Sequence, residues 1–368
     1  MTPEEYRAKL KTDFIFFLTE LWADRKMDRY HMLGWAELDM AAWIANSDEP
    51  QRGALGPRGI GKTTYGTAAY SCFRWNQNPN CKIIIPSKNI GAAKKMVKLA
   101  RGWISSVHFL KHLMPRLSTR NRIWRDNTDM FDVGPSELSK DPSCWATGIS
   151  GQLENARADL IIADDVETRE NTTTLEARQD LQDRVDEFTS IATFGKREIV
   201  YLGTFHHEES LYLAESEKGV TFRTWPIITP HAHDKVLNLA PLIREKIDAG
   251  QLNESTKQST YDGSPVFPHR HDKIYLAERR ARGRTYFAMQ QMLVCDLADE
   301  ERYPLRLRDL IVFDTAENQA PISIAWGMTN DQGRGTAIEE IKSLGFGNDR
   351  FHRQIFFDKQ WAPFRGTK

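Results

Sequence analysis

The sequence predicts an α/β protein in which helices flank a mainly parallel sheet. Three apolar segments, 82–87, 158–163 and 198–202, have the length and composition of strands that are buried on both faces. Helical segments separate them in the chain, and this alternation favours parallel strands over hairpins. A further strand ends near Leu55, where a glycine-rich stretch leads into a helix that extends to about Trp75.

The composition limits what the chain can be. Among 368 residues, 50 are Lys or Arg and 50 are Asp or Glu, so the formal net charge is zero. This balance argues against a wholly basic, histone-like DNA binder, and contact with DNA requires a local basic patch. The four cysteines form no CxxC pair, which argues against a zinc ribbon or a disulfide framework. No apolar run is long enough to span a membrane, and Glu4 and Glu5 are unlike a signal peptide, so we expect a soluble intracellular protein.

Local signals predict the remaining elements. Thr2 and Glu5 form a capping box at the start of an N-terminal helix whose apolar face includes 14–18. A hairpin is predicted at 122–133, with its turn at Asp126 and Asn127. We also predict helices at 34–46, 90–107, 174–191 and 273–293, and a strand within 221–228.

Residues 56–63 match the pattern G-x-x-x-x-G-K-[ST]. Glycines in this pattern allow a tight turn whose N–H groups face phosphate oxygens. Lys62 places a positive charge on the β- and γ-phosphates, and Thr63 offers its hydroxyl to Mg²⁺. We therefore predict a site for ATP with Mg²⁺. Its loop residues are Gly56, Pro57, Arg58, Gly59, Ile60, Gly61, Lys62, Thr63 and Thr64.

The apolar segment at 158–163 ends in acidic residues. Asp164 follows it directly and is placed to hold Mg²⁺ together with Thr63. Asp165 or Glu167 would orient and deprotonate the attacking water, and the residues leave that choice open. The long stretch between the loop and these acids has room for at least one extra strand, as in the motor-type branch of P-loop NTPases.

Three more residues are candidates for sensing or stabilising the transition state. Thr204 follows the strand at 198–202 and could sense the γ-phosphate, although an ordinary turn explains it equally well. Arg58 could contact the γ-phosphate in the same chain, and Arg157 could reach the ATP of a neighbouring subunit as an arginine finger. The alternative for both arginines is a surface ion pair.

The predicted fold class is thus a P-loop NTPase with an additional strand and a small helical lid or linker subdomain. Pro, Gly, Asn and Ser become frequent after Pro230. We assign 1–232 to the ATPase core with its N-terminal helical segment, 233–310 to the lid or linker subdomain, and 311–368 to a connector.

Two groups of basic residues could grip the DNA backbone without reading its sequence. The first lies on one broad face of the helix predicted at 90–107. The second lies in and before the predicted hairpin, and we favour it because a hairpin can project into a channel. A solvated surface is the alternative for both. The groups are Lys94, Lys95, Lys98 and Arg101, and Arg116, Arg120, Arg122 and Arg125.

These motifs resemble the large terminase subunit, or DNA maturase, of the short-tailed T7-like bacteriophages. The likeness extends from about Phe14 to Ile311, and its matching segments are 58–62, 148–153, 157–167, 201–204, 225–226 and 303–309. The resemblance implies a ring-forming ATPase, expected to be a pentamer, which docks on the portal of a procapsid and packages double-stranded viral DNA. It also implies a small terminase subunit as partner, Arg157 as the trans-acting arginine, the host cytoplasm as location, and no contact with a membrane.

The chain departs from the family pattern in three places. Glu37 stands where the family tends to carry a Gln that reads adenine, and a carboxylate cannot donate to adenine N7. Phe205 follows Thr204, where the family has Pro. Full-length relatives carry a C-terminal nuclease domain, whereas no strand-borne acidic cluster follows Ile311. We therefore expect an ATPase portion without endonuclease activity, in which 311–368 leads toward an absent nuclease domain.

Two other functions compete with this interpretation. A helicase-like translocase on free nucleic acid shares the loop and the acidic strand end, but it normally has a second motor lobe, for which the chain has no room. A non-enzymatic capsid-assembly protein would not need these motifs. Histidines at 206–207, 231, 233, 269 and 271 lack a Cys or carboxylate at metal-site spacing, and we interpret them as solvent-exposed loop residues.

Overall fold

The computed structural model describes residues 1–25, 33–46, 48–115, 125–151, 156–193, 198–257 and 261–295, and four short strands beyond them. The chain divides into two compact units, Met1–Leu297 and Ala298–Lys368. In the second unit, β8 (Gln319–Pro321) pairs with β11 (Trp361–Pro363), and β9 (Ile324–Met328) pairs with β10 (Arg353–Phe357), both antiparallel. The divisions at 232 and 310 remain predictions.

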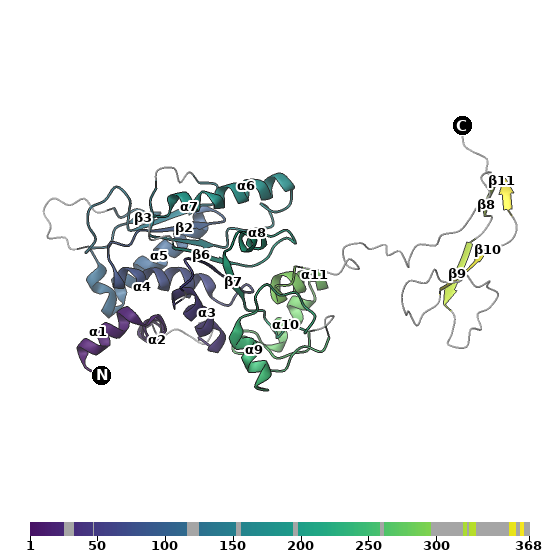
Figure 1. Cartoon of the computed structure of the whole chain (residues 1–368), viewed down its shortest axis with the longest axis horizontal. Helices are drawn as coiled ribbons and strands as arrows, with labels where there is room; N and C mark the ends of the chain where they lie inside the picture. Colours follow the sequence, from purple (N-terminus) through teal and green to yellow (C-terminus); the bar gives the residue numbers. More distant parts are fainter. Residues whose placement is uncertain are drawn as a thin grey trace. The chain divides into compact units, whose positions relative to one another are not determined.

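A seven-stranded sheet forms the centre of the first unit (Figure 1), in the order β3-β4-β2-β5-β6-β1-β7. Every neighbouring pair is parallel except β3 and β4. The predicted mainly parallel sheet is therefore confirmed. Its strands are β1 (Gln51–Leu55), β2 (Ile83–Ser87), β3 (Met130–Phe131), β4 (Cys144–Gly148), β5 (Leu160–Asp164), β6 (Glu198–Gly203) and β7 (Thr221–Thr224).

Alternation along the strands creates two apolar layers, one on each face of the sheet. Ile83, Ile85 and Leu160 pack with the helices from α1 to α5 in one layer. Ile84 and Ile161 point to the other layer, which α6, α7 and α8 cover (Figure 1). A smaller third cluster lies among residues 227–294, in the part of the unit that contains α10 and α11. The helices are α1 (Pro3–Thr12), α2 (Phe14–Arg25), α3 (Trp35–Asn46), α4 (Tyr70–Gln77), α5 (Ile90–Ser106), α6 (Leu175–Asp186), α7 (Phe188–Ile191), α8 (Leu211–Glu217), α9 (Pro241–Asp248), α10 (Lys273–Arg280) and α11 (Arg284–Phe287).

Three predicted helices are interrupted. The N-terminal helix breaks at Asp13, whose carboxylate accepts from the Phe16 N–H at 2.9 Å and so begins α2. The helix predicted at 174–191 is divided into α6 and α7. The helix predicted at 273–293 stops before Gly283, whose φ of 109° lies in the region that favours glycine. Within the described ranges, no helix is both long and apolar enough to cross a bilayer.

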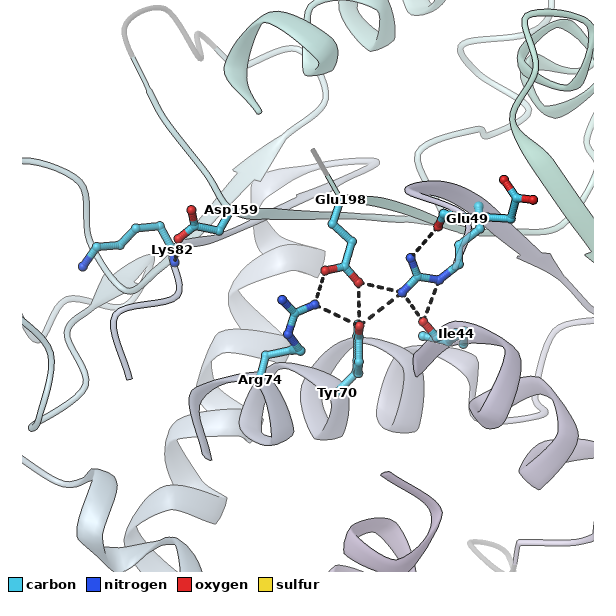
Figure 2. Close-up of polar contacts among 8 residues, drawn as sticks. Ile44, Glu49, Tyr70, Arg74, Lys82, Asp159 and Glu198 are labelled. Carbon is cyan, nitrogen blue, oxygen red and sulfur yellow. Dashed lines mark hydrogen bonds and ion pairs between the residues drawn. The ribbon is translucent and has the colours of Figure 1, made fainter. Parts of the chain in front are cut away.

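A buried ionic cluster ties the starts of β1 and β6 to α4 (Figure 2). Arg52 of β1 donates to Glu198 Oε1 at 2.6 Å and, through Nε, to the Ile44 carbonyl at 2.7 Å. Tyr70 donates to the same Glu198 oxygen at 2.6 Å, and Arg74 pairs with the other oxygen. Burial would raise the pKa of Glu198, but the charges of Arg74 and Arg52 outweigh it and hold the pKa below its usual value.

Removing Glu198 should destabilise the protein strongly. Glu198→Ala leaves Arg52, whose side chain is 2% exposed, without its carboxylate partner. We expect the free energy of unfolding to fall by about 3 kcal/mol, measured by denaturant unfolding at neutral pH. Glu254→Ala is the matched control, because it breaks the more exposed pair with Arg244 (2.8 Å) and should cost less than about 1 kcal/mol. Equal losses in the two variants would contradict a structural role for the buried cluster.

Candidate nucleotide-binding site

The glycine-rich loop joins β1 to a helix, as the sequence predicts. Gly59 and Gly61 have φ values of 91° and 84°, a backbone that side chains rarely adopt. After the loop the chain forms a π-helical segment, η2 (Thr63–Ala69), which continues as α4. The N–H of Thr64 donates to the Gly61 carbonyl at 2.8 Å and closes the first turn. The loop therefore meets a helix N-terminus, where anions are stabilised.

Lys62 lies buried under this loop. Its ammonium donates to the carbonyls of Gly56 at 2.7 Å and Pro57 at 3.0 Å, and to the Thr204 hydroxyl at 3.1 Å. Burial lowers the pKa of Lys62, and the nearby charges of Asp165 and Asp164 oppose this effect. The Thr204 hydroxyl also donates to the Gly56 carbonyl at 2.7 Å. The predicted Thr204 is thus brought directly to the loop.

The acidic strand end meets the loop at the same edge of the sheet. The Thr63 hydroxyl donates to Asp164 Oδ1 at 2.9 Å. Burial and the charge of Asp165 raise the pKa of Asp164 to about 7, although its hydrogen bond from Thr63 opposes the shift. A hydroxyl beside a carboxylate is a ligand set that suits Mg²⁺. Within the described residues, β6 separates the strand before the loop from the strand that ends in Asp164.

The two candidate bases have different surroundings. Asp165 is half-buried, with a φ of 48°, and its N–H donates to the Leu202 carbonyl at 2.8 Å. Glu167 is 1% exposed, and both of its oxygens are engaged. They accept from the His206 N–H at 2.7 Å, the Ser210 hydroxyl at 2.6 Å and the Leu211 N–H at 2.7 Å. Burial outweighs these bonds and raises the pKa of Glu167 to about 7.

Arg58 is exposed at the tip of the loop and reaches the segment after β6. Its Nη2 lies 3.1 Å from Nε2 of His206, and the Gln290 amide lies 3.2 Å from Nδ1 of the same ring. Burial, helped by the charge of Arg58, lowers the pKa of His206 to about 4, so the ring is neutral at physiological pH. A neutral imidazole carries one N–H and accepts at only one nitrogen. His206 therefore cannot accept hydrogen bonds from Arg58 and Gln290 at the same time.

The exposed-loop interpretation of the six histidines is wrong for five of them, because only His233 is exposed. His206 is partly buried, and His271 is only 3% exposed. His206 is contacted by Gln290, 84 residues further along the chain, whereas His271 packs against Tyr275 of the next helical turn, with ring centroids 4.6 Å apart. No local pattern in the sequence indicates the contact between Gln290 and His206, and the sequence prediction missed it.

Two predicted site residues do not contact the phosphate loop. Arg157 lies away from it, and Glu37 is bonded to other side chains. Arg157 is exposed and precedes β5, so the length of that strand, roughly 15 Å, separates it from the Asp164 edge of the same chain. Glu37 is fully buried at the start of α3. It accepts from Arg270 Nε at 2.6 Å and from the Gly34 N–H at 3.1 Å, and it lies 3.0 Å from His269 Nε2.

The described basic residues of the two DNA-contact groups lie on or near α5. Lys95 and Lys98 are exposed, Lys94 is partly buried, and the burial pattern of α5 places its apolar residues against the core. Arg101 pairs with Asp126 and donates to the Asn127 carbonyl at 3.1 Å.

Arg125 lies 3.4 Å from Asp132, so it too is held by a carboxylate. The Asn127 N–H donates to the Met130 carbonyl at 2.9 Å and Asp126 pairs with Phe131, so the chain turns at 128–129, two residues after the predicted position. Arg116, Arg120 and Arg122 lie outside the described residues.

The fold and the site together define an α/β protein in which a glycine-rich loop, a buried lysine and an acidic strand end meet at one edge of a parallel sheet. The sequence is 35% identical over 352 residues to the large terminase subunit of Enterobacteria phage T3. The sequence is therefore similar over nearly all of its length to a phage large terminase subunit, the kind of protein that its motifs resemble. The alignment covers 94% of this chain and 57% of the T3 protein, so the chain spans little more than half the length of that relative. No protein-family model matches the chain.

Solved structures of the large terminase from a thermophilic bacteriophage also align with part of the chain. One has a TM-score of 0.36 at 11% identity and covers 53% of this chain and 46% of its own. A second structure of the same terminase, in complex with ADP, has a TM-score of 0.36 at 12% identity, with the same coverage.

The backbone conformation of the phosphate loop predicts how a glycine-to-alanine substitution in it changes the stability of the protein. Gly61→Ala places a β-carbon at a φ of 84° and 3.3 Å from Arg270 Nη2, so we expect it to cost about 1–2 kcal/mol of stability. Gly102→Ala is the matched control, because Gly102 lies in α5 with nothing within 4 Å of the new β-carbon. That variant should gain about 0.5–1 kcal/mol from helix propensity. Thermal unfolding measures both changes, and a neutral Gly61→Ala would contradict the strained loop.

Proposed function

We propose that this chain hydrolyses ATP and that, as part of a large terminase subunit, it powers the movement of double-stranded viral DNA into a procapsid. One observation carries the proposal: Lys62, Thr63, Asp164 and Thr204 converge at one edge of the sheet through contacts of 2.9–3.1 Å. These are the groups that a phosphate loop and an acidic strand end bring to a nucleotide. The intervening β6 supports the motor-type, additional-strand class of P-loop NTPase.

The residues present fit ATP together with Mg²⁺. Lys62 would exchange its carbonyl partners for the β- and γ-phosphates, and the N–H groups of the loop would face the same anion. Thr63 and Asp164 would hold the Mg²⁺, since they offer adjacent oxygens and the Asp164 carboxylate is shielded from solvent. The ion, when bound, would neutralise charge on the phosphates. Thr204, bonded to both Lys62 and the Gly56 carbonyl, would sense whether Lys62 holds a phosphate.

Asp165 is the better candidate for the residue that orients and deprotonates the attacking water. It follows the proposed metal ligand directly and is half-buried at the edge of the sheet. Glu167 has three donors on its two oxygens and is almost completely buried, so it would have to break these bonds before it could accept a proton. We assign Glu167 to fixing the segment after β6.

The two arginines receive different roles. Arg58, at the tip of the loop, would contact the γ-phosphate in the same chain after leaving His206. Arg157 lies a strand's length from that edge, and therefore any contact with ATP would be with the nucleotide of a neighbouring subunit. This assignment requires the ring, expected to be a pentamer, that the resemblance implies.

The proposed partners are double-stranded DNA, the portal of the procapsid and a small terminase subunit. The exposed Lys95 and Lys98 on α5 would contact the DNA backbone, whereas Arg101 and Arg125 already pair with carboxylates. The place of action would be the host cytoplasm, with transient docking on the procapsid.

Lys62→Ala should reduce ATP hydrolysis to background while the chain stays folded. The variant removes the charge that would hold the β- and γ-phosphates, and steady-state phosphate release measures the loss. Lys111→Ala, on an exposed segment, serves as the control and should hydrolyse ATP like the wild type. Turnover that survives Lys62→Ala would refute the proposed site.

The same assay distinguishes the packaging motor from a helicase-like translocase. Stimulation by double-stranded DNA with procapsids supports packaging. Stimulation by free single-stranded nucleic acid, with no response to procapsids, supports the translocase.

Asp165→Asn and Glu167→Gln should have different effects. Loss of a general base lowers kcat by about 10²–10⁴-fold, so Asp165→Asn should lower kcat in this range and leave ATP affinity near the wild-type value. Glu167→Gln turns an acceptor into an amide donor that faces existing donors, so it should lower the free energy of unfolding by about 2 kcal/mol. Hydrolysis rates and denaturant unfolding test both. A stable Glu167→Gln variant with lost turnover would reassign the base to Glu167.

A further inference from the structure

A segment from late in the chain lies directly on the phosphate loop. The Tyr275 hydroxyl donates to the Arg58 carbonyl at 3.4 Å. A β-carbon on Gly59 would lie 3.6 Å from that hydroxyl, and one on Gly61 would lie 3.3 Å from Nη2 of Arg270. Both positive-φ glycines of the loop are therefore neighbours of residues 270–275, although about 210 residues separate them in the sequence.

Arg270 is fixed in place from α3. Glu37 accepts from its Nε at 2.6 Å, and the two side chains are 0% and 8% exposed. Because the guanidinium is a rigid plane, one bond at Nε orients the whole group, and Nη2 is the atom nearest Gly61.

A buried ion pair of this kind rarely adds net stability over an apolar pair of the same shape. Its place beside the loop therefore calls for an explanation other than packing.

We propose that Arg270 is a nucleotide-binding residue that donates to the phosphates of a nucleoside triphosphate held in the loop, and that Glu37 is its positioning residue. The inference rests on the proposed function. It adds to the site a residue that is distant from the loop in sequence but lies beside it in the structure. Guanidinium groups bind phosphate oxygens through short, charge-assisted bonds, and Gly61 belongs to the turn whose N–H groups face the phosphates. Glu37 balances the charge of Arg270 when no phosphate is bound.

The consequence is that the bound nucleotide links two distant parts of the unit. The loop follows β1. Tyr275 lies in α10 and Arg270 just before it, and α10 packs in the third apolar cluster. A nucleotide that touches both would hold the third cluster against the loop. Loss of phosphate would remove that bridge and leave the contact between Tyr275 and the Arg58 carbonyl.

The test measures the rise in melting temperature that Mg·ATP induces, together with KM and kcat for ATP. Arg270→Ala should lower ATP affinity by about 10- to 100-fold, since a hydrogen bond to a charged group has this effect, and should leave little nucleotide-induced rise. Arg244→Ala is the matched control, because Arg244 is an exposed arginine on α9 that pairs with Glu254. It should bind ATP like the wild type.

A second variant guards against simple unfolding. Arg270→Gln combined with Glu37→Gln replaces the ion pair by two neutral amides, so no buried charge is left alone. It should unfold near the wild-type temperature without nucleotide and show the same loss of ATP affinity. Wild-type ATP affinity in this double variant, whatever its melting temperature, would overturn the role of Arg270 and leave a structural ion pair.

The proposed function can fail separately. If the wild type shows no rise with Mg·ATP, and Lys62→Ala is indistinguishable from it, both proposals are overturned. If the wild type binds ATP and Lys62→Ala does not, while Arg270→Ala binds normally, only the role of Arg270 is overturned.

Discussion

The register between β5, β6 and β1 is the constraint on which the site depends. Leu55 of β1 lies opposite Gly203 of β6, and Asp164 of β5 lies opposite Leu202. The three strands thus end within one residue of each other, and the chain leaves them at the same edge. A slip of one residue would turn each side chain to the opposite face of the sheet. The contact of Thr63 with Asp164 could not form in that case.

Contacts at the amino-terminal ends of β1 and β6 help to fix this register. Arg52 and Glu198 lie near the starts of β1 and β6, and their pair is held further by Tyr70 and Arg74 of α4. Buried ion pairs add little net stability, but a partner removed or displaced leaves an uncompensated charge. A shifted pairing of β1 and β6 would separate Arg52 from Glu198. The charged cluster therefore disfavours a shifted register of β1 and β6, while burial of the apolar layers supplies most of the driving force for folding.

The sequence predicted the parts of the fold that depend on local pattern. The apolar runs indicated β2, β5 and β6, and the loop pattern located Lys62 and Thr63. It missed β4, because Cys144–Gly148 mixes Trp and Thr with small residues instead of forming an apolar run. It anticipated that Thr63 and Asp164 would meet, but it missed the contacts across the fold that no motif marks. Arg270 against Gly61 depends on how α10 packs, and no periodicity within a window of the sequence carries that information.

The side chains proposed to bind phosphate are satisfied by groups of the chain itself. Lys62 is satisfied by two carbonyls and a hydroxyl, Arg270 by Glu37, and the buried ammonium is therefore not left alone. Binding a phosphate must exchange these bonds, so its net free energy is a difference between two satisfied states. Thr204 reduces the cost of this exchange, because its hydroxyl bonds the Gly56 carbonyl at 2.7 Å independently of Lys62. If the Lys62 ammonium bonded a phosphate instead, the Gly56 carbonyl would keep Thr204 as its donor. Only the Pro57 carbonyl would then lose its donor.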